Sequence, residues 1–216
     1  MSQKPVLVTG FEPYGGRGIN PSAEIAKRLD GVEIEGSPVV GYTLPVAYRL
    51  LRQRIDELVS QLEPAAVISL GLWPGEPVIR LERFAVNLAD FEIADNEGLS
   101  LKDVPLDVGA PTALPARLPL RAIEKALLEA GIPARLSNSA GTFLCNATLY
   151  TFLQRLPETA PCGFIHLPYL PEQVAELLRQ GQQEQAMELH QRADLASMSL
   201  DLMLRAVQIA IAVTIS

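Results

Sequence analysis

The chain has 216 residues, of which 48% are hydrophobic and 20% are charged, and this composition gives no reason to expect disorder. Acidic residues exceed basic ones by 25 to 18, for a formal net charge of −7, which argues against nucleic acid and anionic membranes as partners. The length predicts a single domain over residues 1–216 with one sizeable core, and it leaves small molecules or peptides as the favoured ligands.

The N-terminal stretch "MSQKPVLVTGF" lacks the basic start, long apolar run and cleavage site of a signal peptide. Together with only two cysteines, this predicts a protein of the reducing cytoplasm. The apolar tail "AVQIAIAVTIS" is too short to span a bilayer. The two histidines and two cysteines match none of the common zinc patterns, so neither a metal nor a cofactor is expected.

Short β-rich runs alternate with helical patterns along most of the chain. Strands are expected over 5–10, 38–44, 65–72, 134–139 and 162–167, and helices over 20–29, 45–62 and 120–130 and after Cys145. Asn20 and Pro21 suit the N-cap and the first position of the first helix. The alternation predicts an α/β fold with a mostly parallel sheet between helices.

Two regions depart from the alternation. Within residues 78–109, the stretch 78–98 is extended and partly alternating and is followed by a loop rich in proline, aspartate and glycine, which favours a strand and hairpin at a sheet edge with mobile flanks. Residues 171–211 are mostly helical, with a predicted break near Gly181.

Aromatic residues follow the first predicted strand, where open α/β sheets bind ligands. Phe11 and Tyr14 lie in this loop, and either ligand binding or ordinary loop packing explains them. The loop contains three glycines but neither of the common phosphate-binding patterns, so a nucleotide site is not favoured.

Cys145 lies between a loop of small residues, 137–142, and an apolar helical stripe. The stripe consists of Leu149, Phe152, Leu153 and Leu156. The thiol is therefore expected at a helix N-terminus, where the helix dipole favours a thiolate. A small buried hydrophobe and a catalytic nucleophile are both compatible with this position.

A nucleophilic thiol needs a base and usually a group that orients the base. His166 ends an apolar strand at the same sheet edge as Cys145, whereas His190 lies within a helical pattern and is the weaker candidate. The candidate orienting carboxylates are Glu82, Asp90, Glu92 and Asp95. Spacing alone does not choose among them, and Glu82 has arginines at 80 and 83 that would equally explain it as a surface ion pair.

Four segments, in this order along the chain, resemble pyroglutamyl peptidase I, also called pyrrolidone-carboxylate peptidase. They are "GFEPYGGRGINPS" (10–22), "LERFAVNLADFEIADNEG" (81–98), "SNSAGTFLCNATLY" (137–150) and "GFIHLPYLPEQ" (163–173). The resemblance implies a metal-free cysteine peptidase that removes an N-terminal pyroglutamyl residue from peptides. It assigns the nucleophile to Cys145, the base to His166 and the orienting carboxylate to Glu82.

The same resemblance implies a single three-layer α/β/α domain, assembled as a homodimer or homotetramer. It places Phe11, Tyr14 and Phe143 around the substrate, with Asn20 holding the first loop. Because the pyroglutamyl ring is a neutral lactam, its pocket should be apolar with few hydrogen-bonding groups.

Two positions depart from the family pattern. Leu72 stands where a glutamine is frequent, and Glu92 stands where an arginine near the oxyanion site is expected. The alternatives are therefore a cysteine-dependent amidase or acyltransferase of other specificity and a catalytically weakened binding protein on the same fold.

Overall fold

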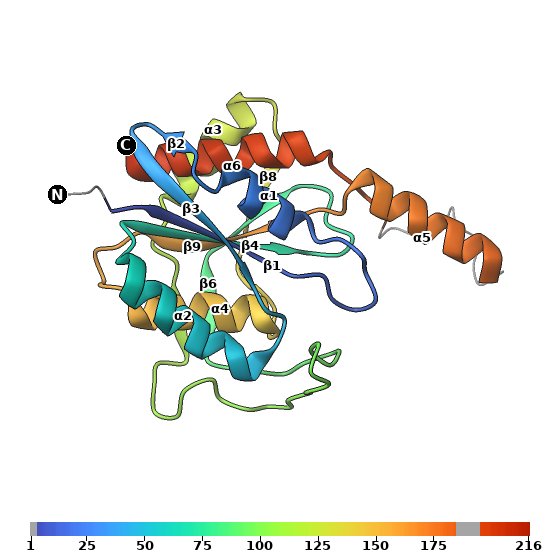
Figure 1. The fold of residues 1–216 in the computed structure, drawn as a ribbon, viewed down its shortest axis with the longest axis horizontal. Coiled ribbons are helices and arrows are strands. Elements are labelled where there is room, and N and C mark those ends of the chain that lie inside the picture. The colour runs from blue at the N-terminus through green and yellow to red at the C-terminus, as the bar shows by residue number, and fades with distance from the viewer. Residues whose placement is uncertain (1–3, 185–194) are drawn as a thin grey trace.

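A seven-stranded mixed sheet lies between two layers of helices in the computed structural model, which describes residues 4–184 and 195–216 (Figure 1). The strand order is β2-β3-β1-β4-β9-β5-β8. Its strands are β1 Val6–Phe11, β2 Glu33–Ile34, β3 Ser37–Leu44, β4 Ala66–Leu72, β5 Ile79–Glu82, β8 Ala134–Ser137 and β9 Cys162–Leu167. Strands β3, β1, β4 and β9 are parallel, whereas β5 runs antiparallel to β9 and parallel to β8. The predicted α/β sandwich with a mostly parallel sheet is confirmed.

The helices divide between the two faces of the sheet (Figure 1). They are α1 Pro21–Leu29, α2 Tyr48–Leu62, α3 Leu120–Glu129, α4 Leu144–Arg155, α5 Pro171–Glu184 and α6 Leu200–Ile215. One face packs against α1, α3 and α6, and the other against α2 and α4. Helix α5 extends away from this body from the end of β9.

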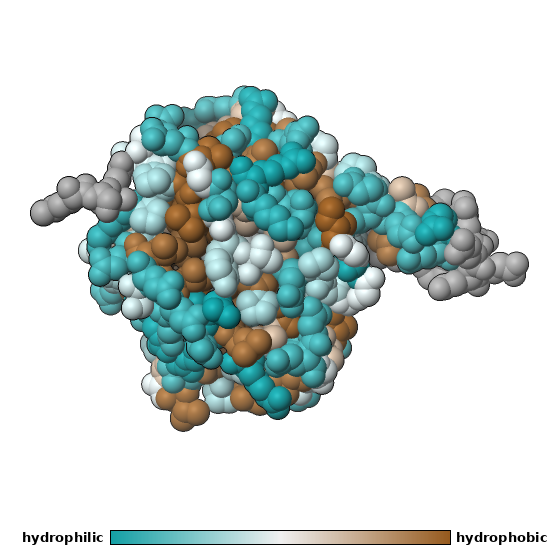
Figure 2. Space-filling model, in the orientation of Figure 1, coloured by the Kyte–Doolittle hydropathy of each residue, from teal (hydrophilic) through white to brown (hydrophobic). Residues whose placement is uncertain are grey.

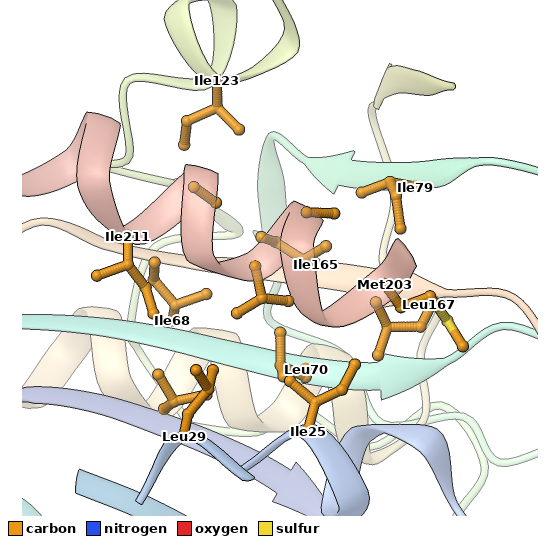
Figure 3. Close-up of a cluster of buried hydrophobic side chains, with 14 of the residues drawn as sticks. Ile25, Leu29, Ile68, Leu70, Ile79, Ile123, Ile165, Leu167, Met203 and Ile211 are labelled. Atoms are coloured by element: carbon orange, nitrogen blue, oxygen red, sulfur yellow. The ribbon is translucent and has the colours of Figure 1, made fainter. Parts of the chain in front are cut away.

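Each face of the sheet buries its own set of apolar side chains. Figure 3 shows one set, in which Leu70 of β4 lies over Ile25 of α1 and Ile68 of β4 lies beside Ile211 of α6. Strand β4 is buried along its whole length because helices cover both of its faces. Figure 2 shows hydrophilic residues over much of one face of the molecule with smaller hydrophobic patches between them, which is ordinary for a globular chain.

The start of α1 agrees with the prediction from its sequence. The Asn20 side chain accepts a hydrogen bond from the Ser22 backbone nitrogen, and Pro21 occupies the first turn. Helix α2 begins at Tyr48 rather than at Pro45, because Ala47 is still extended at φ −145° and ψ 108°. No helix in the described ranges is long and apolar enough to cross a membrane.

Two expectations from the sequence are wrong. Strand β5 is an inner strand between β9 and β8, not an edge strand, and its alternation reflects buried polar groups rather than exposure to solvent. A separate two-stranded sheet pairs β6 Phe84–Val86 with β7 Ala113–Pro115. Helix α5 also continues through Gly181 to Glu184 without a break at the glycine.

The close approach of β1 to α1 depends on a glycine. An alanine Cβ at Gly10 would lie 2.1 Å from the Ser22 backbone oxygen, whereas a Cβ at Gly18 would meet no atom within 4 Å. We expect Gly10→Ala to lower the free energy of unfolding by about 1–3 kcal/mol or more through overpacking. Gly18→Ala, measured by the same urea titration, should change it little. Equal effects of the two substitutions would contradict this account of the β1–α1 contact.

Candidate active site

Three elements bring the candidate catalytic residues together at the carboxyl edge of the parallel strands. Cys145 is the second residue of α4, His166 is the fifth of β9, and Glu82 ends β5. The side chains of His166 and Glu82 are 1% and 0% exposed, and Cys145 is half-buried. The sheet and the start of α4 therefore hold the thiol and the imidazole beside one cavity.

A glycine beneath the thiol makes this approach possible. Gly71 of β4 lies opposite His166 in the parallel ladder. A Cβ at this position would be 2.9 Å from the Cys145 Sγ and 2.9 Å from the Phe164 ring. Because real Cβ atoms essentially never approach other atoms so closely, only glycine lets α4 place its thiol against the sheet.

The imidazole of His166 is held by Glu82. Nδ1 of His166 lies 2.8 Å from Oε1 of Glu82, inside the sheet layer. The antiparallel register sets Glu82 opposite Phe164, two residues along β9 from His166. A long side chain reaches such a diagonal neighbour. An ionised carboxylate only accepts hydrogen bonds, so Nδ1 carries the proton and Nε2 keeps a free lone pair.

Glu82 has a second partner in Arg80, which the sequence suggested only as a member of a surface ion pair, whereas the side chains of Arg80 and Glu82 are 12% and 0% exposed. Arg80 donates from Nε to the same Glu82 oxygen at 2.8 Å, and its guanidinium lies 3.8 Å from the centre of the Trp73 ring. The Trp73 ring in turn meets the His166 ring edge-on at 4.9 Å. Arg80 and Trp73 thus enclose the histidine–carboxylate pair from the side. The feature of the sequence that could have indicated this arrangement is the chain's single tryptophan, which directly follows a buried strand.

Burial keeps both reacting groups neutral in the resting site. The pKa of the Cys145 thiol is raised to about 12, chiefly by burial and also by the charge of Glu82, while the hydrogen bond from the Cys145 backbone N–H opposes the rise. Burial also lowers the pKa of His166, and the hydrogen bond and charge of Glu82 oppose that shift. Desolvation of the charged form therefore outweighs the stabilisation that the helix N-terminus was expected to give the thiolate.

A cavity of about 400 Å³ opens over Cys145 and His166. Tyr14 and Phe143, both predicted to bind substrate, lie in its wall with their ring centres 6.2 Å apart. Leu72 also lines it and offers no polar side-chain atom there. These three side chains give the cavity apolar surface, and Arg17 adds a charged group beside the Tyr14 ring.

Two other predicted residues lie behind this wall. Phe11 is 3% exposed and is part of the buried cluster beneath the cavity. Asn20 is also buried, and its Nδ2 donates to the Glu12 carbonyl oxygen at 3.1 Å while its Oδ1 caps α1. Asn20 therefore fastens the loop that carries Tyr14. Neither residue is among those that line the cavity, so their contact with substrate stays a prediction.

The remaining candidates have other surroundings. Asp90 lines the cavity and pairs with Lys102 at 3.2 Å, and Glu92 is an exposed residue of the same wall. The charge of Glu92 is not among the causes that shift the Cys145 pKa. Asp95 instead accepts hydrogen bonds from backbone nitrogens at the turn of residues 95–99 and from Tyr48.

His190 lies outside the described residues. Within residues 4–184 and 195–216, no group of three or more histidine, cysteine or acidic side chains is arranged to hold a metal ion.

Comparisons with known proteins agree with this geometry. The family described as Pyroglutamyl peptidase matches residues 4–216. The pyrrolidone-carboxylate peptidase of Pyrococcus furiosus is 45% identical over 182 residues, covering 82% of this chain and 86% of that protein. The one of Klebsiella pneumoniae (strain 342) is 43% identical over 172 residues, covering 79% and 80%.

Solved structures are equally similar. The crystal structure of pyrrolidone carboxyl peptidase from the hyperthermophile Pyrococcus furiosus has a TM-score of 0.90 at 41% identity, with 98% of each chain covered. The chain therefore belongs to the pyroglutamyl peptidase family and is a cysteine hydrolase of the pyroglutamyl-peptidase I type.

Proposed function

We propose that Cys145, His166 and Glu82 catalyse hydrolysis of the amide bond after an N-terminal pyroglutamyl residue of peptides. The observation that carries this assignment is the 2.8 Å contact between His166 and Glu82 at the cavity that Cys145 lines. In this arrangement a carboxylate fixes one ring nitrogen of the base and leaves the other for the thiol.

The reaction starts from the neutral pair. As Sγ of Cys145 attacks the scissile carbonyl carbon, Nε2 of His166 takes the thiol proton. Glu82 then stabilises the imidazolium, and the backbone N–H of Cys145 donates to the developing oxyanion. His166 returns the proton to the leaving amine, which departs and leaves a pyroglutamyl thioester on Cys145.

The second half of the reaction uses the same groups. Nε2 of His166 takes a proton from water as the water oxygen attacks the thioester carbonyl. The C–S bond breaks, Cys145 recovers its proton from the imidazolium, and pyroglutamate leaves. No oxidant, metal or other cofactor is needed to balance these steps.

The apolar wall supports selection of a lactam. Tyr14 and Phe143 offer ring surface to the uncharged pyroglutamyl ring, whose burial costs little compared with that of an ammonium group. The carboxylates of Asp90 and Glu92 lie in the same cavity and are the groups by which a rival specificity, for a free amino terminus, would operate.

Hydrolysis of matched amides distinguishes specificity for the pyroglutamyl ring from specificity for a free amino terminus. We expect the protein to release a fluorogenic amine from the pyroglutamyl amide at least about 100-fold faster, in kcat/KM, than from the prolyl or alanyl amide, because only the first presents a neutral lactam. Cys145→Ser should lose this activity and Cys162→Ser should keep it. Preference for alanyl or prolyl amide would favour an amidase of other specificity, and no turnover of any amide would favour a binding protein.

Alkylation tests the position of the nucleophile. Both thiols have pKa values raised by burial, but only Cys145 lines the cavity beside an imidazole, whereas Cys162 is fully buried at the start of β9. We expect iodoacetamide at neutral pH to modify Cys145 at least about tenfold faster, since the base can take the thiol proton as the bond forms. Peptide mass mapping over time measures both rates, and equal rates would contradict the assignment.

Glu82→Gln tests the orienting carboxylate. The amide keeps the size and a hydrogen-bonding group but no longer stabilises an imidazolium by charge, so kcat should fall between about 10²- and 10⁴-fold in a folded protein. Glu76→Gln is the matched control, because Glu76 is also a buried carboxylate that contacts Arg80 but makes no hydrogen bond to His166. If both variants keep the wild-type kcat, Glu82 has only a structural role.

The wider setting follows from the same proposal. We propose a cytoplasmic enzyme that acts on peptides with N-terminal pyroglutamate, independent of nucleic acid and membranes, and assembled as a homodimer or homotetramer. Light scattering coupled to gel filtration measures the assembly, and a strictly monomeric active enzyme would overturn that part.

A further inference from the structure

The cavity contains a neutral hydrogen-bond donor with no partner. The Tyr14 hydroxyl makes no hydrogen bond to any residue in the described part of the chain, and its oxygen is accessible to water. The Thr142 hydroxyl, in the same cavity, already donates to the Asp90 carbonyl oxygen at 2.6 Å. Tyr14 therefore has its donor available to a bound molecule.

The Tyr14 ring is held in place on two sides. Its centre lies 6.2 Å from that of Phe143 and 5.0 Å from the Arg17 guanidinium carbon. Arg17 also donates to the Tyr14 carbonyl oxygen at 3.4 Å and to the Tyr169 hydroxyl at 3.1 Å. Arg17 thereby fastens the loop of residues 12–19 to the end of β9, so the phenol is a preorganised donor rather than a mobile one.

The direction of the reaction places the pyroglutamyl ring on the Tyr14 side. His166 must give its proton to the leaving amine, so the leaving group lies beside His166 and the Trp73 ring, 4.9 Å from it. The acyl group then extends from Sγ into the remainder of the cavity, whose wall includes Phe143 and Tyr14. The Trp73 indole, which carries a neutral N–H donor, lies beside His166 on the leaving-group side.

We propose that the Tyr14 hydroxyl donates a hydrogen bond to the lactam carbonyl oxygen of the pyroglutamyl ring and is a specificity-determining group. This inference rests on the proposed function. A phenol matches an uncharged carbonyl acceptor, and the neighbouring Phe143 and Leu72 side chains offer no such group. Arg17 also lines the cavity, but its guanidinium already donates to the Tyr14 carbonyl oxygen and the Tyr169 hydroxyl.

The phenol stays a donor throughout the working pH range. Burial raises the pKa of Tyr14 well above its ordinary value, and a negative charge on Cys145 raises it further, while Arg17 opposes both effects. Neither neutral nor mildly alkaline conditions remove the proton from the hydroxyl.

The hydrogen bond would separate pyroglutamyl from prolyl substrates. The two rings have the same size, but a prolyl ring has a methylene where the lactam has its carbonyl. A bound prolyl group would leave the desolvated Tyr14 hydroxyl unpaired, and sites built to hydrogen-bond a substrate reject analogues that lack the acceptor.

The test removes one oxygen atom. Tyr14→Phe keeps the ring against Phe143 and Arg17, and Tyr48→Phe is the matched control, because Tyr48 loses the same atom from a ring packed on Phe91 outside the cavity. The probe is 2-pyrrolidone, a lactam ring without a scissile bond. Its dissociation constant, measured by calorimetry, should rise about three- to tenfold in Tyr14→Phe and stay unchanged in Tyr48→Phe.

Kinetics complete the test. KM for the pyroglutamyl amide should rise in parallel in Tyr14→Phe, with the preference for pyroglutamyl over prolyl amide reduced. Unchanged 2-pyrrolidone binding in Tyr14→Phe overturns the proposal, and so does a loss confined to kcat, which would place the hydroxyl at the scissile carbonyl. Because 2-pyrrolidone binding needs no turnover, these outcomes are independent of whether wild type hydrolyses the pyroglutamyl amide, which tests the proposed function separately.

Discussion

The buried hydrogen bond between His166 and Glu82 is the interaction on which the rest of the site depends. It exists because β5 runs antiparallel to β9 and places Glu82 one diagonal step from the histidine. A buried carboxylate needs partners, and Arg80 and His166 share one of its oxygens at 2.8 Å each. Removing one member of such a buried cluster typically costs about 3–5 kcal/mol, so the strand order and the catalytic arrangement constrain each other.

The same burial sets the resting state of the thiol. Because burial disfavours charge on both groups, Cys145 remains a thiol and His166 remains a neutral imidazole. The ion pair then forms only as Sγ attacks, when the substrate carbonyl takes up the negative charge and Glu82 faces the new imidazolium. A thiol kept neutral in this way is also less exposed to oxidation between turnovers, because the thiolate is the reactive form.

Much of the fold and part of the site could be predicted from local patterns. Apolar runs and helix signals located β1, β4, β9 and the starts of α1 and α4, because each is fixed by its own residues and neighbours. The position of β5 could not be predicted in the same way. The alternation of Arg80 and Glu82 with apolar residues is typical of a half-exposed edge strand, but here the polar side chains face each other and His166 in the interior. Choosing Glu82 among four carboxylates therefore needed the long-range pairing of β5 with β9 or the family resemblance.

The central claim is that Cys145 carries the acyl group during turnover. Mixing the protein with excess pyroglutamyl amide, quenching in acid within the first turnovers and mapping the peptides by mass spectrometry measures this directly. The account predicts a pyroglutamyl thioester on the peptide that contains Cys145, which disappears as substrate is exhausted and does not form in His166→Ala. Turnover of the amide with the acyl group on another residue, or full activity in Cys145→Ser, would contradict it.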